Sequence, residues 1–167
     1  MLGSATLALI AARASWTIRQ DATAAAISAA TNALVEEHDG QALRELAGAS
    51  LHINVFELGV LVDDALKELG VATGDMTKDD AQLVAAYHYA SQAIEGTLPV
   101  RELASWAHRV VGHQGHAIAQ ELVELDDAYD AYDGWGGEPD ARQVVMSFMD
   151  AAGPEIQKWM RPGAASQ

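Results

Sequence analysis

The chain has 167 residues, half of them apolar and a fifth charged, a composition typical of a globular protein that buries a hydrophobic core. Its 24 Asp and Glu against 10 Lys and Arg give a net charge of −14, which disfavours binding to nucleic acid or to anionic membrane surfaces. The lack of cysteine excludes disulfides and thiolate metal sites. No segment approaches the ~20 apolar residues of a membrane span, so we expect a soluble, cytoplasmic protein.

The first part of the chain predicts three helices in succession. Residues 4–16 are rich in Ala and Leu and predict the first helix. Asp21 is a suitable N-cap for the second, which Asp39 and Gly40 end. A short helix is expected over Ala42–Ala47, before Gly48.

The middle of the chain carries clearer helical patterns. Residues 57–69 place apolar side chains at helical spacing, with charged side chains largely away from them. Thr77, with Asp80 three residues later, is a variant of the capping box and predicts the start of the next helix. That helix ends at Gly96, and Pro99 suits the first turn of another.

The last part continues the helical pattern with two interruptions. Gly112 and Gly115 are expected to break or bend the chain. Residues 118–132 then carry an apolar seam at alternating spacings of four and three, formed by Ile118, Leu122, Leu125, Tyr129 and Tyr132. Asp140 with Gln143 predicts the start of a helix, which Gly153 and Pro154 are expected to separate from a final turn.

These patterns predict an all-α fold. We expect a single-domain antiparallel helical bundle of about six to eight helices over residues 1–161, with a loose tail over 162–167. The seam at 118–132 would pack either inside a monomer or across the axis of a homodimer.

One short motif carries a resemblance to known proteins. The segment 39–48 reads Asp-Gly-Gln-Ala-Leu-Arg-Glu-Leu-Ala-Gly, and Leu-Lys-Glu-Leu-Gly follows at 66–70. Over residues 21–72 the chain resembles a group of small bacterial all-helical proteins with an ALRELAG-type turn between two helices. That group has no established activity, so the resemblance implies helices and a bacterial setting. Leu43 and Leu46 are expected to enter the core, with Arg44 and Glu45 outside.

Histidines and carboxylates in the second half suggest a metal site. His113 and His116 are three residues apart, a spacing at which two imidazoles on one helix face can chelate an ion, and Glu121 or Glu124 could complete the set. His108 is five residues from His113 and is expected to lie off its face. Neither His-Glu-x-x-His nor Glu-x-x-His occurs, so the zincin and di-iron carboxylate signatures are absent.

A strongly acidic stretch supplies a second candidate, a binding surface. No Lys or Arg lies between Arg109 and Arg142, and like charges three or four residues apart destabilise a helix. A basic partner or a bound cation would relieve that repulsion, with Trp135 and Tyr132 as anchors. The predicted surface consists of Glu121, Glu124, Asp127, Asp130, Asp133 and Trp135.

Two functions from different classes follow from these patterns. The first is a protein-binding module, antitoxin-like, immunity-like or adaptor-like, that holds a basic partner on residues 121–140 and needs no cofactor. The alternative is a divalent-metal-dependent hydrolase or small-ligand-binding protein that uses His113, His116 and nearby carboxylates. An acidic face that serves solubility alone is the third reading.

Overall fold

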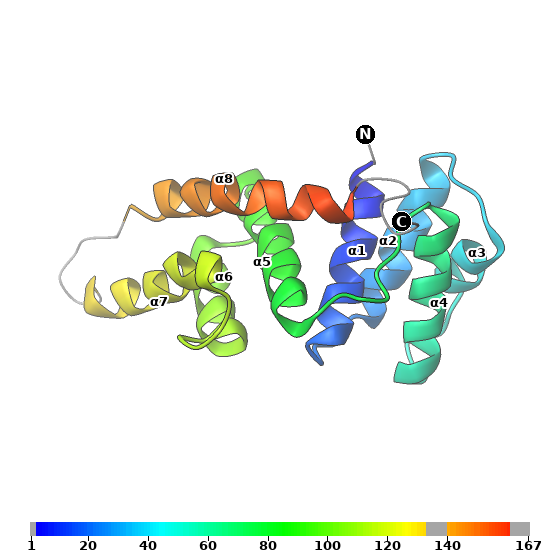
Figure 1. Ribbon diagram of the computed structural model, residues 1–167, viewed down its shortest axis with the longest axis horizontal. Helices are drawn as coiled ribbons and strands as arrows, with labels where there is room; N and C mark the ends of the chain where they lie inside the picture. Colours follow the sequence, from blue (N-terminus) through cyan, green and yellow to red (C-terminus); the bar gives the residue numbers. More distant parts are fainter. Residues whose placement is uncertain (1–2, 133–139, 161–167) are drawn as a thin grey trace. The chain divides into compact units, whose positions relative to one another are not determined.

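The computed structural model describes residues 3–132 and 140–160, and every regular element in these ranges is helical. The predicted all-α fold is confirmed (Figure 1). Along the chain, the described elements are α1 (Ser4–Thr17), α2 (Thr23–Val35), α3 (Gln41–Ala47), α4 (Val55–Glu68), α5 (Lys78–Glu95), α6 (Val100–Trp106), η1 (Ala107–Val111), η2 (Ala117–Ala119), α7 (Gln120–Tyr132) and α8 (Ala141–Trp159). No helix in this described part is long and apolar enough to cross a membrane.

The described residues belong to two compact units, which we describe separately: residues 3–81 with 157–160, and residues 82–132 with 140–156. In the first unit, α1 packs on α2 and α4, while α3 packs on α2 and α4 (Figure 1). Small side chains allow close approach of α2, where Ala26, Ala29, Ala30 and Ala33 are buried. Leu43 and Leu46 are fully buried, as the sequence predicts.

Side chains from α1 and α4 join the helices of the first unit. Glu68 caps α3, because its two carboxylate oxygens accept the backbone N–H groups of Ala42 at 2.8 Å and Leu43 at 3.1 Å. Trp16 donates from Nε1 to the carbonyl of Val55 at 2.8 Å. Glu68, which lies well beyond the end of the motif at Gly48, therefore holds the start of the ALRELAG segment.

The second unit brings α6 and η1 against α7 (Figure 1). Leu122 and Leu125 are buried, as the predicted seam requires, and Leu103 of α6 is buried as well. The seam ends at Tyr129, since Tyr132 is 47% exposed.

Several helix boundaries follow the local sequence, since α3 ends directly before Gly48 and α5 directly before Gly96. Asp21, predicted as the N-cap of α2, instead lies one residue before the observed N-cap, Ala22. Thr77 and Asp80 form a reciprocal capping box. The backbone N–H of Thr77 donates to the Asp80 carboxylate at 3.0 Å, and the backbone N–H of Asp80 donates to the Thr77 hydroxyl at 3.1 Å. The break predicted at Gly153 and Pro154 is wrong, because α8 continues through Pro154 to Trp159. The apolar stripe of α8 runs on past the proline to Ile156, which is 1% exposed, so packing outweighs the lost backbone hydrogen bond.

Candidate metal centre

A widened helical turn leads into the candidate site. After α6 the backbone forms the π-helical turn η1, in which Gly112 donates to the carbonyl of Ala107 at 2.9 Å, five residues back. Gly112 has φ +69°, a left-handed conformation that glycine adopts without strain. The π-turn and Gly112 together end the helix and set the direction of the following loop.

This turn brings His108 and His113 together. Their ring centroids are 5.1 Å apart and the ring planes meet at 72°. The expectation that a spacing of five places His108 away from His113 is wrong. That expectation assumed an α-helix continuing through His113, whereas the π-turn ends at Val111 and Gly112, with φ +69°, turns the chain so that His113 lies beyond the helix end.

Helix α7 supplies two neighbouring carboxylates to the same place. His113 Nε2 lies 3.3 Å from Asp127 Oδ2. His108 Nδ1 lies 2.6 Å from Asp126 Oδ2 and 3.9 Å from Asp127 Oδ1. One ligand atom each from His108, His113 and Asp127 falls within 4.8 Å of the others.

The separation of two of these residues suits a tetrahedral metal ion. Ligand atoms about 2.1 Å from such an ion lie roughly 3.4 Å from each other. The 3.3 Å separation of His113 Nε2 and Asp127 Oδ2 already matches that distance. His108 is farther away, with its Nδ1 3.9 Å from Asp127 Oδ1. Two imidazoles and one carboxylate form a set that zinc and similar transition metals accept.

Asp126 fixes the ring of His108. Its hydrogen bond with Nδ1 is the main reason that the pKa of His108 is raised above the usual value, with the charges of Asp127, Asp126 and Asp130 adding to it and desolvation opposing it. A carboxylate that accepts from one ring nitrogen leaves the other nitrogen with its lone pair. Asp126 thus has the position of a carboxylate that orients a ligand histidine without itself belonging to the group of three.

His116, the other histidine predicted as a ligand, has a different environment. Its Nδ1 accepts the backbone N–H of Ile118 at 3.1 Å, which caps η2. The lone pair of that nitrogen is therefore engaged, and the group of three contains His108 in place of His116.

The loop that carries His113 is held by two glutamines. Gln120 donates from Nε2 to the carbonyls of Gly112 at 3.0 Å, Gly115 at 3.4 Å and His116 at 3.3 Å. Gln82, which is 3% exposed, accepts the N–H of His116 at 3.3 Å. A Cβ on Gly115 would collide with the carbonyl of Val111. These contacts position the loop before any ligand arrives.

The predicted acidic surface is partly described. Glu121, Glu124, Asp127 and Asp130 are all exposed on α7, each three residues from the next. Asp127 belongs both to this stripe and to the candidate metal centre. Asp133 and Trp135 lie outside the described residues.

Sequence reasoning missed the roles of His108 and Asp126. The available signal was the glycine at position 112, directly before His113, which permits a helix to end in a wide turn. A pairing across 18 residues, from His108 to Asp126, has no signature in a single sequence.

Comparison with known proteins gives no match for this chain, whether against protein-family models, curated proteins or solved structures.

Proposed function

We propose that residues 82–156 form a domain that binds a divalent transition-metal ion through His108, His113 and Asp127. The observation that carries the proposal is the convergence of one ligand atom from each residue within 4.8 Å. The His108–Asp126 hydrogen bond and the Gln120 contacts support it, because both hold ligands in place without an ion.

The ligand set suggests what a bound ion would do. Three protein ligands leave a coordination position for water or a small molecule, the pattern of catalytic rather than structural zinc sites. A bound ion of this kind acts as a Lewis acid and lowers the pKa of water to near neutrality. The site is open to solvent, since the side chains of His113 and Asp127 are about half exposed. Hydrolysis of a small substrate, or binding of a small ligand to the ion, is the activity that we propose.

Thermal melting in EDTA, followed by addition of Zn²⁺, Mn²⁺, Mg²⁺ or Ca²⁺, tests this proposal. An ion at a hundred times its dissociation constant stabilises the fold by about 2.7 kcal/mol, which shifts the melting temperature by several degrees. We expect that shift with Zn²⁺ and a smaller one with the oxygen-preferring Mg²⁺ and Ca²⁺.

Substitutions separate the proposed site from adventitious histidine binding. H108Q and H113Q should each remove the zinc-dependent shift. H52Q, which changes an exposed histidine of the first unit, should keep it. An unchanged shift in H108Q or H113Q, or no shift in the unsubstituted protein, contradicts the proposal.

A second function is favoured by the stripe of exposed carboxylates on α7. We propose that Glu121, Glu124 and Asp130 also attract a basic protein segment, because evenly spaced like charges repel one another and a cationic partner relieves the repulsion. A lysine-rich peptide should bind with an affinity that falls as NaCl is raised.

The triple variant E121Q/E124Q/D130N should lose most of that binding. A control variant with three exposed acids changed in the first unit, E37Q/E45Q/E57Q, should retain it. Because the α7 triple variant keeps His108, His113 and Asp127, its zinc-dependent shift should persist. Equal peptide affinity in both triple variants contradicts the second function and leaves the metal proposal standing.

A further inference from the structure

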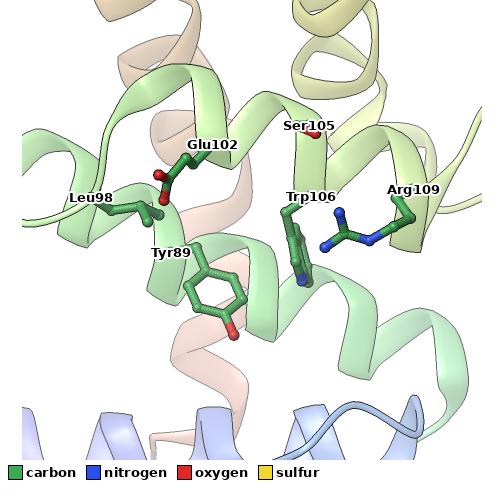
Figure 2. Close-up of a pocket in the computed structure, with 6 residues that line it drawn as sticks. All are labelled: Tyr89, Leu98, Glu102, Ser105, Trp106 and Arg109. Carbon is green, nitrogen blue, oxygen red and sulfur yellow. The ribbon is translucent and has the colours of Figure 1, made fainter.

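A cavity of about 370 Å³ opens in the second unit between α5 and the α6–η1 segment. Figure 2 shows the six residues that line it: Tyr89, Leu98, Glu102, Ser105, Trp106 and Arg109. None of them belongs to the His108–His113–Asp127 group. The cavity is therefore a separate feature, although Arg109 follows His108 directly in the sequence.

Two aromatic rings form the walls of the cavity. Tyr89 and Trp106 have ring centroids 4.8 Å apart and planes at 67°, so their faces meet at a steep angle (Figure 2). Leu98 adds an apolar side chain beside them. Such walls suit the carbon skeleton of a small molecule, and aromatic faces also attract an ammonium group.

Opposite charges flank these walls. Glu102 and Arg109 both line the cavity and are exposed, and neither forms an ion pair within residues 3–132 and 140–160. In Figure 2 the carboxylate of Glu102 lies towards Leu98, and the guanidinium of Arg109 extends towards Trp106. Seven residues separate them, about two helical turns or roughly 10 Å along the axis. Ser105 lies between them in the sequence and offers a hydroxyl.

We propose that this cavity binds a small zwitterion, an ω-amino acid whose aliphatic skeleton separates its two charged ends. The carboxylate of the ligand pairs with Arg109, whose planar guanidinium suits bidentate binding of a carboxylate. The ammonium group pairs with Glu102 beside the aromatic walls, and the skeleton packs on Trp106 and Leu98.

Charge distinguishes this ligand from simpler ones. Residues 82–156 contain twelve Asp and Glu against three Lys and Arg, so the surrounding potential opposes a purely anionic ligand. A purely cationic ligand gains from Glu102 but leaves Arg109 as an uncompensated like charge in the same cavity. A zwitterion satisfies both groups and carries no net charge.

Three probes with the same five-carbon chain test the proposal: 5-aminopentanoate, pentylamine and pentanoate. Their affinities are measured by NMR chemical-shift titration of the whole chain, in EDTA so that a failure of the metal proposal does not affect the result. 5-Aminopentanoate should bind most tightly, with shifts at Trp106 and Tyr89.

Variants assign each end of the ligand. R109Q should lower the affinity for 5-aminopentanoate by about tenfold, because one hydrogen-bonded charge pair is lost. The affinity for pentylamine should not fall. E102Q should lower the affinity for 5-aminopentanoate by a similar factor, and the affinity for pentanoate should not fall. R142Q, an exposed arginine of α8, is the matched control and should change none of the three affinities.

Several outcomes overturn the proposal. Pentylamine that binds as tightly as 5-aminopentanoate and is indifferent to R109Q would indicate a site for organic cations. Pentanoate that binds as tightly as 5-aminopentanoate, with an affinity that E102Q does not change, would indicate an anion site. No binding of any probe, or equal losses in R109Q and R142Q, would show that the cavity does not recognise this class. Melting curves of each variant confirm that it is folded.

Discussion

Single residues in this protein are defined by neighbours far along the chain. His108 is an unremarkable helical histidine in the sequence, yet a 2.6 Å contact with Asp126 determines how its ring is oriented and raises its pKa. Trp16 of α1 donates a hydrogen bond to the carbonyl of Val55, 39 residues along the chain. In both cases the important partner is on another helix.

The raised pKa of His108 can be measured directly. In metal-free protein, an NMR titration of the histidine rings should give His108 a pKa above 6.5, because protonation strengthens its hydrogen bond to Asp126. D126N should bring that pKa back towards 6.5, and D127N should lower it less, since Asp127 acts only through its charge.

The same shift has a consequence for stability. Because the folded pKa is raised, the ion pair contributes its full stabilisation below pH 6.5 and loses it as the pH rises through the folded value. The stability difference between the unsubstituted protein and D126N should therefore be larger at pH 5.5 than at pH 8.5. A difference that grows with pH would contradict this assignment.

Gly59 tests the packing of Trp16. A Cβ at this position would lie 2.6 Å from Trp16 Cζ2 and 2.7 Å from Cε2, closer than side chains approach. G59A should therefore destabilise the protein by about 1–3 kcal/mol in urea unfolding, although alanine favours a helix. G74A is the control, because nothing lies within 4 Å of its new Cβ, and it should be neutral or slightly stabilising. Equal stability of the two variants would show that Trp16 moves aside freely.

Whole elements differ in how far a single sequence predicts them. Helix starts follow from local chemistry, as the Thr77–Asp80 capping box shows, because both partners lie within one turn. Pro154 and the π-turn at Ala107–Val111 do not. The helix around Pro154 continues through a buried apolar stripe, and the π-turn packs on α7. The candidate site depends on that turn, which is why the sequence indicated His113 but paired it with His116.

The loop between η1 and η2 should depend on Gln120. Q120L removes three hydrogen bonds to carbonyl groups of residues 112–116, so the loop no longer holds His113. We expect zinc affinity to fall by about 10- to 100-fold, as for other groups that orient a ligand. Q143L, on the exposed face of α8, should leave the affinity unchanged. Zinc titration with a competing chelator measures the affinity of both variants. If Q120L binds zinc as tightly as the unsubstituted protein, Gln120 does not position the site.

At the scale of the whole molecule, charge is the property that the sequence shows most directly. The net charge of −14 and the carboxylates of α7 imply repulsion that salt screens. The melting temperature in EDTA should therefore rise as NaCl increases from about 20 to about 300 mM. The E121Q/E124Q/D130N variant should show a smaller rise, because it has lost part of the repulsion. A melting temperature that falls with salt would mean that attraction within ion pairs such as Arg13–Asp63 outweighs the repulsion among the carboxylates.

The π-turn also implies a way to search for similar centres in other proteins. The turn ends at Val111, and Gly112 then places the second histidine beyond the helix end, five residues after the first. Written along the chain, the centre is His-x4-His-x12-Asp-Asp with glycine directly before the second histidine. A search for paired histidines three or four residues apart overlooks this pattern, whereas a search that allows a fifth residue and a glycine stop would find it.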